Sequence, residues 1–389
     1  MTVSRKMSSL GTESAFEMLA KARALEAQGR DIIHLEIGEP DFDTPAHIVD
    51  EGVAALRDGY THYGPTAGLP ELRETIARNV GETRGVSVSP DQIVVTPGAK
   101  PIMFYTIMTM AQRGVEVIYP NPGFPIFESM IRFCGARAVP MPLLSENGFH
   151  PDLDALEASI TDRTRLMVVN SPGNPTGANL SRRELEAIAS FVRDRDDLYV
   201  LSDEIYKDII YDGEHNSIAS LPGMAERTVI LDGFSKSYAM TGWRLGYGVF
   251  PDPLREHILK LSANSVSCAA SFSQRAAIKA LDGPQDGVTD MVAEFRQRRQ
   301  IIARGLREIP GVECPEPEGA FYAFPNISGT GMSSQEFENR ALNEAGVALL
   351  SGEAFGVYGK GCVRLSYANS QENLKRALER LKEMVVGAR

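Results

Sequence analysis

Between about residues 90 and 280, short apolar runs alternate with amphipathic segments, and this alternation is the strongest constraint on the fold. The apolar runs are QIVVTP (92–97), VEVIYP (115–120), RLMVVN (165–170), LYVLSDEI (198–205), TVILD (228–232) and RLGYGVF (244–250). Several are apolar throughout, which is typical of strands that are buried on both faces of a sheet. Strands that alternate with helices predict an α/β domain with a mostly parallel central sheet.

Two short patterns mark the starts of helices. In SRRELEAIASFVRD (181–194), Glu184 follows Ser181 by three residues, which predicts a capping box. Thr44 and Pro45 precede AHIVDEGVAAL. We therefore expect Thr44 to be the N-cap of that helix and Pro45 to lie in its first turn.

The length of 389 residues suits one large domain and one smaller domain. We predict that residues 48–290 form a large α/β domain. The flanking segments contain a charged helix, EFRQRRQIIARGLREI, and a last helix, ENLKRALERLKEMV. We predict that residues 1–47 and 291–389 together form a smaller α+β domain.

The net charge of −11 argues against nucleic acid or an anionic membrane as the main partner. The four cysteines are far apart and form no Cys-x-x-Cys pair, which is typical of thiols in a reducing compartment. The first residues lack the apolar core of a secretory signal, and no apolar run approaches the ~18 residues of a spanning helix. We therefore expect a cytoplasmic protein.

Polar, aromatic and glycine residues follow the predicted strands, where ligands of parallel sheets bind. These residues are Gly98, Ala99 and Lys100 after 92–97, Phe124 after 115–120, Asn174 after 165–170, Asp203 and Tyr206 after LYVLS (198–202), Ser235 and Lys236 after 228–232, and Arg244 after a Thr-Gly-Trp turn. Arg364 instead lies inside an apolar strand, CVRLSYA, where an unpaired guanidinium would be costly.

Each of these residues also has a purely structural explanation. Gly98–Lys100 fits a tight turn before a helix, and Phe124 fits a core aromatic. Asn174 lies between two prolines in SPGNPTG, as turn asparagines do. Asp203 fits a helix N-cap. These alternatives stay open for any residue taken singly.

Taken together, the residues fit one cofactor, pyridoxal 5′-phosphate. Gly98–Lys100 at a helix start, with Ser235 and Arg244, can bind its phosphate. Phe124 can stack on its ring, and Asn174 and Tyr206 can donate to its phenolate. Asp203 can supply the carboxylate that keeps the ring nitrogen protonated, and Lys236 can supply the amine of the Schiff base. Arg364 can bind the carboxylate of an amino-acid substrate through its planar guanidinium.

Over nearly its whole length, the chain resembles a fold type I, class I aminotransferase of the bacterial aspartate/aromatic branch. The matching motifs occur in the family's order: EIGEPDFDTP, YGPTAGLPELR, TPGAK, NSPGNPTG, SDEIY, GFSKSYAMTGWRLGY, GAFYAF and CVRLSYA. The resemblance implies the family's pyridoxal-phosphate-dependent transferase fold.

The resemblance also implies roles for single residues. Lys236 would be the Schiff-base lysine and proton-transfer catalyst. Gly38 and Arg364, with Asn174, would hold the substrate α-carboxylate. Tyr63, in THYGPTAG, would reach the phosphate of the other subunit, so the resemblance implies a homodimer with shared active sites. The ring and phosphate contacts it implies are those given above for Asp203, Tyr206, Asn174, Arg244, Ser235, Ala99 and Lys100.

Only a few positions of the sequence bear on which substrate is preferred. Phe124 stands where aspartate-specific members often have tryptophan. The resemblance assigns to Lys100 a contact with a distal substrate carboxylate, which indicates an acidic substrate. The segment at Glu13 lacks the matching hydroxyl contacts, and 264–274 offers no arginine for a second carboxylate. An aspartate- or glutamate-like donor and an aromatic donor both remain candidates.

The expected reaction is ping-pong exchange of an amino group between an L-amino acid and a 2-oxo acid such as 2-oxoglutarate, through Lys236. A carbon–sulfur β-lyase or a decarboxylase on the same fold is the main alternative. A cofactor-binding regulator is disfavoured because no basic helix pair precedes the cofactor domain. The sequence contains no Gly-x-Gly-x-x-Gly after a strand and no His-Glu-x-x-His, which argues against a Rossmann dehydrogenase, a zinc hydrolase and a bound metal.

Overall fold

A seven-stranded sheet forms the centre of the computed structural model, which describes residues 3–387. Its order is β2-β8-β7-β6-β5-β3-β4. The strands are β2 (Ile93–Thr96), β3 (Glu116–Asn121), β4 (Arg137–Pro142), β5 (Thr164–Asn170), β6 (Tyr199–Asp203), β7 (Thr228–Gly233) and β8 (Gly246–Val249). β8 runs antiparallel to β2 and β7, and the other pairings are parallel. The predicted α/β class with a mostly parallel sheet is confirmed.

Strand β4 is absent from the strands predicted from sequence. It pairs only with β3, at one edge of the sheet, and most of its residues are partly or fully exposed. Its sequence, RAVPMP, contains Pro140 and Pro142. Proline cannot donate a hydrogen bond to a ladder and is confined to edge strands, so this strand lacks the signature of a buried one.

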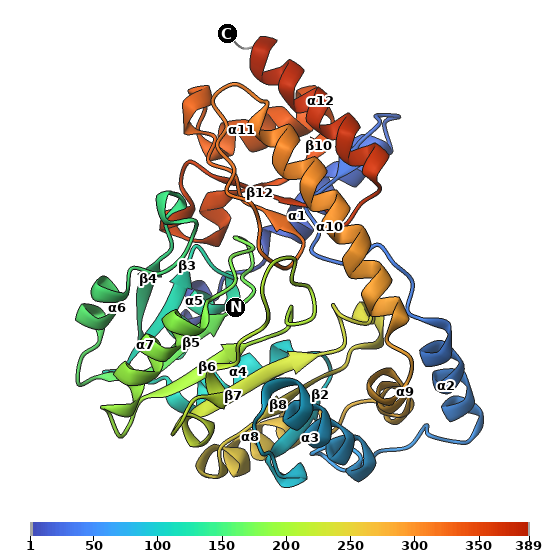
Figure 1. Ribbon diagram of the computed structural model, residues 1–389, viewed down its shortest axis with the longest axis vertical. Coiled ribbons are helices and arrows are strands. Elements are labelled where there is room, and N and C mark those ends of the chain that lie inside the picture. Colours follow the sequence, from blue (N-terminus) through green and yellow to red (C-terminus); the bar gives the residue numbers. More distant parts are fainter. Residues whose placement is uncertain (1–2, 388–389) are drawn as a thin grey trace.

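Helices cover both faces of the central sheet (Figure 1). Neighbouring residues of a strand point to opposite faces, so each buried strand packs against both layers. Val94 and Leu201 belong to a core cluster with α4, α5 and α8, whereas Ile93 and Ile230 pack with α3 and α9. The helices are α1 (Ser14–Glu26), α2 (Ala46–Arg57), α3 (Pro70–Arg84), α4 (Lys100–Met110), α5 (Ile126–Phe133), α6 (Leu153–Ser159), α7 (Arg182–Arg193), α8 (Asp252–Ser265), α9 (Ser271–Asp282), α10 (Asp286–Arg307), α11 (Ser334–Arg340) and α12 (Gln371–Gly387).

Of the two predicted helix starts, one is confirmed and one is wrong. Ser181 and Glu184 form the capping box at the start of α7. In contrast, Pro45 is the N-cap of α2, and Thr44 lies outside the helix. The Thr44 hydroxyl instead donates to the Ala239 carbonyl at 2.7 Å and accepts from Trp243 Nε1 at 3.0 Å. Thr44 therefore ties the start of α2 to the turn that precedes Arg244.

Smaller sheets lie beside the central one. β9 (Tyr322–Ala323), β11 (Leu350–Ser351) and β12 (Val363–Ser366) form an antiparallel sheet, and β1 (Ile33–His34) pairs in parallel with β10 (Val347–Ala348). Helix α10 extends from beside α9 to the region of α12 (Figure 1). The predicted domain boundaries at 47/48 and 290/291 fall inside α2 and α10, so the two-domain division stays a prediction.

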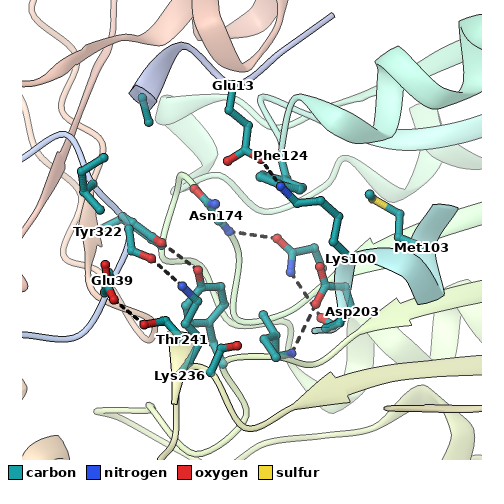
Figure 2. A pocket seen from close by; sticks show the side chains of 18 of the residues that line it. Glu13, Glu39, Lys100, Met103, Phe124, Asn174, Asp203, Lys236, Thr241 and Tyr322 are labelled. Carbon is teal, nitrogen blue, oxygen red and sulfur yellow. Dashed lines mark hydrogen bonds and ion pairs between the residues drawn. The ribbon is translucent and has the colours of Figure 1, made fainter. Parts of the chain in front are cut away.

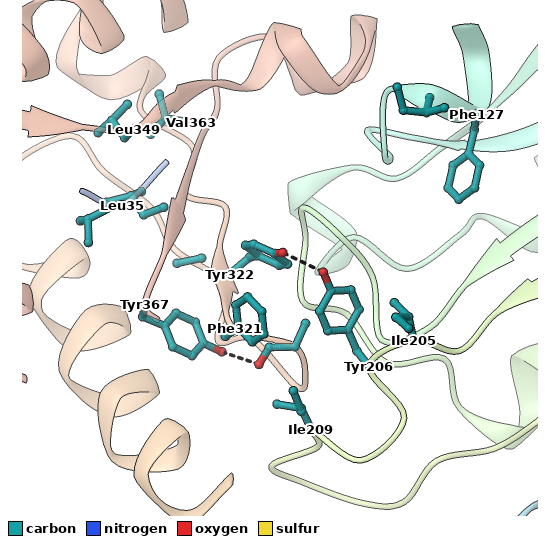
Figure 3. Close-up of a cluster of buried hydrophobic side chains, with 14 of the residues drawn as sticks. Leu35, Phe127, Ile205, Tyr206, Ile209, Phe321, Tyr322, Leu349, Val363 and Tyr367 are labelled. Carbon is teal, nitrogen blue, oxygen red and sulfur yellow. Dashed lines mark hydrogen bonds between the residues drawn. The ribbon is translucent and has the colours of Figure 1, made fainter. Parts of the chain in front are cut away.

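A buried aromatic cluster joins the loop after β6 to the C-terminal region (Figure 3). Tyr206, in that loop, packs edge-on against Phe321 and Tyr322 with ring centroids 5.5 and 5.7 Å apart. The hydroxyls of Tyr206 and Tyr322 are hydrogen-bonded at 2.7 Å. Aromatic packing and the hydroxyl pair together hold the Tyr206 ring in one orientation.

The four cysteines, Cys134, Cys268, Cys314 and Cys362, are free thiols. Between residues 3 and 387, no helix combines the length and apolar character needed to cross a membrane. The same residues contain no group of three or more His, Cys, Asp or Glu side chains placed to hold a metal ion.

Candidate active site

The carboxyl ends of β2, β3, β5, β6 and β7 point to one edge of the central sheet, where a cavity of about 480 Å³ lies (Figure 2). Parallel strands bring the residues that follow them to the same edge, which is why segments far apart in sequence meet here. The cavity is lined by these residues predicted from sequence: Gly38, Ala99, Lys100, Phe124, Asn174, Asp203, Tyr206, Ser235, Lys236, Arg244 and Arg364.

Two predicted residues do not line the cavity. Gly98 lies just behind it with a φ of +82°, and a Cβ there would come within 2.5 Å of Arg244 Nη2. The φ of +82° is favourable only for glycine, and a Cβ here would also displace the Arg244 guanidinium. Tyr63 is not among the residues that line the cavity, and it is 90% exposed. The predicted contact of Tyr63 with the phosphate of another subunit therefore stays a prediction.

The cavity also contains residues that the sequence analysis did not select. Asn170 ends β5 and pairs with Asp203 at the end of β6. An asparagine at the end of an apolar strand could have been selected as a candidate site residue from the sequence. Tyr322 lies in the quoted motif GAFYAF, but its hydroxyl contact with Tyr206 depends on tertiary packing. Glu13 and Glu39 come from the N-terminal segment, and no local pattern distinguishes them from surface carboxylates.

Lys236 projects into the cavity from the turn after β7. Its Nζ donates to the Gly38 carbonyl at 2.5 Å and lies 5.9 Å from the centre of the Tyr206 ring. Removal from water lowers the pKa of Lys236 to about 8; Glu39 opposes this shift and Arg364 favours it. A lysine with a lowered pKa supplies an unprotonated amine near neutral pH, which can act as nucleophile or base.

Asp203 ends β6 and is 9% exposed. Its Oδ1 accepts a hydrogen bond from the Ile205 backbone N–H at 3.3 Å. Burial raises the pKa of Asp203 to about 7, the Ile205 N–H opposes this shift, and the nearby carboxylates of Asp232 and Glu204 add to it. A buried carboxyl with this pKa becomes fully ionised when a cation is placed beside it.

The next residue, Glu204, belongs to a buried charge network behind Asp203. Arg84 Nε donates to Glu204 at 2.5 Å, and Arg84 Nη2 donates to Asp232 at 2.5 Å. His215 Nε2 lies 3.0 Å from the same Glu204 oxygen. Burial favours neutral Glu204, but Arg84 and His215 hold its pKa well below the usual value. Removing one partner of a buried ion pair costs about 3–5 kcal/mol, so these contacts hold the Glu204 side chain, next to Asp203, in place.

Arg364 lies on β12 and is 4% exposed. Its guanidinium donates to Asn174 Oδ1 at 3.2 Å and to the Glu36 carbonyl, and lies over the rings of Tyr322 and Phe355. Within the described part of the chain, Arg364 Nε has no hydrogen-bond partner. A buried guanidinium with spare donor capacity is suited to binding a carboxylate.

Helix α4 begins at the cavity with Ala99 as its N-cap residue and Lys100 as its first residue. The first N–H groups of a helix lack partners within the helix and favour anions. Arg244 and Ser235 line the same cavity, and Arg244 is held in the left-handed region (φ +52°) with its Nη1 donating to the Thr241 carbonyl at 2.7 Å. A helix start, a guanidinium and a hydroxyl thus line one cavity, and each is a hydrogen-bond donor of the kind that anions bind.

The family model for aminotransferases of class I and II matches residues 30–381. An aspartate aminotransferase from Pyrococcus abyssi is 42% identical over 360 residues, which cover 92% of each chain. Aromatic-amino-acid aminotransferase 2 from Thermococcus litoralis is 41% identical, over 92% of this chain and 93% of that protein. The structure of Thermus thermophilus aspartate aminotransferase with maleate superimposes with a TM-score of 0.94 at 37% identity, covering 99% of this chain and 100% of that one.

The predicted resemblance is confirmed by these matches, which extend over nearly the whole chain and carry the aspartate aminotransferase-like fold. The chain belongs to the class I and II aminotransferase family and is an aminotransferase.

Proposed function

We propose that this aminotransferase binds pyridoxal 5′-phosphate in the cavity and moves an amino group between an L-amino acid and a 2-oxo acid. The observation that carries the proposal is that one cavity is lined by the buried amine of Lys236, the buried carboxyl of Asp203 and the buried guanidinium of Arg364; burial lowers the pKa of Lys236 and raises that of Asp203. Perturbed pKa values of opposite sense in one cleft are typical of acid–base sites.

The residues present fit the phosphate of this cofactor. The start of α4 at Ala99 and Lys100, the Ser235 hydroxyl and the Arg244 guanidinium surround one part of the cavity. Gly98 leaves the space that a Cβ would fill against Arg244. These donors are those that a phosphate dianion needs.

The residues also fit the ring. A protonated pyridine nitrogen supplies the cation that buried Asp203 lacks. Phe124 provides an aromatic face, and Tyr206 provides a hydroxyl donor. Asn174 uses its Oδ1 to accept from Arg364, so its Nδ2 is the group that can donate to a phenolate oxygen.

When bound, the cofactor supplies an aldehyde that carries the amino group and a ring that accepts electrons. The chain supplies the proton chemistry and the positioning. Nζ of Lys236 takes the proton from the substrate Cα, which its lowered pKa permits near neutral pH. Arg364 and Asn174 orient the α-carboxylate of the substrate. The hydrogen bond with Tyr322 holds the Tyr206 hydroxyl in position.

The function is tested by incubating the protein with pyridoxal 5′-phosphate, single L-amino acids and 2-oxoglutarate. We expect glutamate and the matching 2-oxo acid to form in equal amounts by a ping-pong rate law. Release of carbon dioxide, or of pyruvate and a thiol from cystathionine, without glutamate would instead assign a decarboxylase or a β-lyase.

Replacing Arg364 with alanine is expected to lower kcat/KM for amino acids by roughly 30- to 1000-fold, mainly through KM. Truncating one partner of a buried, hydrogen-bonded charge pair costs about 2–4 kcal/mol. Arg364→Lys keeps the charge but not the planar fork, so it should recover only part of the loss. Steady-state kinetics together with cofactor titration check this result, and an unchanged KM would remove Arg364 from the substrate site.

We also propose a homodimer in which each chain completes its partner's site. Tyr63, which is exposed and does not line the cavity of its own chain, is the residue that would enter the partner's site. Free cysteines suit a reducing compartment, so the proposed location is the cytoplasm.

A further inference from the structure

The N-terminal segment places a carboxylate at the cavity. Glu13 is the residue before α1, and its side chain is 21% exposed. Lys100 Nζ, at the start of α4, donates to Glu13 Oε1 and lies 5.5 Å from the centre of the Phe124 ring (Figure 2). Glu13 and Lys100 both line the cavity, so the ion pair forms part of the surface that a ligand meets.

The other cationic side chains of the cavity already have partners or roles. Lys236, Arg244 and Arg364 are the remaining lysine and arginines among the described lining residues. Under the proposed function, Lys236 is the reactive amine, Arg244 binds the cofactor phosphate and Arg364 binds the substrate α-carboxylate. Lys100 is thus the cation left for a second carboxylate on a substrate side chain, and Glu13 already neutralises it.

We propose that Glu13 is a specificity-determining residue that directs the cavity toward donors with uncharged or cationic side chains and away from dicarboxylic donors. The inference rests on the proposed function. A second substrate carboxylate must share the Lys100 ammonium with Glu13, and like charges in contact repel. A cationic side chain gains the attraction of Glu13, and an uncharged one disturbs neither partner.

A simpler alternative gives Glu13 no effect on specificity. The Lys100 and Glu13 side chains are 44% and 21% exposed, and ion pairs that are open to solvent contribute little. A dicarboxylic substrate would then displace Glu13 from Lys100 at small cost. The two explanations differ in what removing the Glu13 charge does to substrate preference.

The test compares the wild type with Glu13→Gln. Glu17→Gln is the matched control because Glu17 lies in the first turn of α1, just after Glu13, is exposed and does not line the cavity. For each protein, kcat/KM is measured for L-aspartate, L-leucine and L-arginine, and the dissociation constants of the unreactive acids succinate and butyrate are measured by calorimetry.

In Glu13→Gln we expect the aspartate-to-leucine ratio of kcat/KM to rise about tenfold, and the succinate-to-butyrate affinity ratio to rise similarly, whereas the arginine-to-leucine ratio falls. In the Lys100→Met variant, adding Glu13→Gln should raise the aspartate-to-leucine ratio of kcat/KM by less than about threefold, because the Lys100 ammonium is no longer there to bind a second carboxylate.

If Glu13→Gln raises the aspartate-to-leucine ratio of kcat/KM by less than about threefold more than Glu17→Gln does, the proposed role of Glu13 is overturned. That result would leave the proposed function intact provided that the wild type transfers amino groups. Absence of amino-group transfer from every donor in the wild type would overturn the proposed function instead.

Discussion

Lys236→Ala is expected to lower kcat by about 10⁴-fold or more, because the substitution removes both the nucleophilic amine and the base that takes the Cα proton. The variant should still bind pyridoxal 5′-phosphate, since the anion site at Ala99, Ser235 and Arg244 is untouched. Single-turnover absorbance measurements with an amino acid check the loss.

Lys236→Arg is the control for charge. It restores a cation at this position, but arginine stays protonated and cannot act as a base. We therefore expect it to be as inactive as the alanine variant. A single-turnover rate near that of the wild type in either variant would show that another group moves the proton.

Asp203→Asn is expected to lower kcat by about 10²–10³-fold, which is the usual effect of removing one preorganised electrostatic contact from an active site. Asparagine keeps the size of the side chain, but its amide cannot offset a positive charge on the ring nitrogen. Asp203→Glu keeps the carboxylate and should retain more activity than asparagine.

Thermal melts distinguish this effect from unfolding. Loss of an uncompensated buried carboxyl should not lower the Tm of the cofactor-free protein, because burial already disfavours the charged form and raises the pKa of Asp203 to about 7. If Asp203→Asn kept the wild-type kcat, a carboxylate at this position would have no part in the reaction.

The sequence predicted the central sheet because its strands are buried on both faces and therefore carry long apolar runs. It failed at β4, whose prolines and exposed residues are tolerated at an edge. It also failed at Thr44, whose hydroxyl bonds across the fold to Ala239 and Trp243 instead of capping α2. That choice depends on contacts that are remote in sequence.

The same distinction applies to the cavity. Asp203 lies at the end of one predicted strand and Lys236 follows shortly after another, so the parallel sheet brings them to the same edge. Tyr322 and Glu13 reach the cavity from distant segments, and their contacts with Tyr206 and Lys100 follow from packing that no local pattern encodes. The charge of Lys100 was visible in the sequence, but its neutralisation was not.

The most direct test of the account is to reduce the cofactor-loaded protein with borohydride and to map the modified peptide by mass spectrometry. The account predicts loss of the visible absorbance band and a single covalent adduct on Nζ of Lys236. An adduct on a different lysine, or a protein that binds no reducible cofactor, would contradict it.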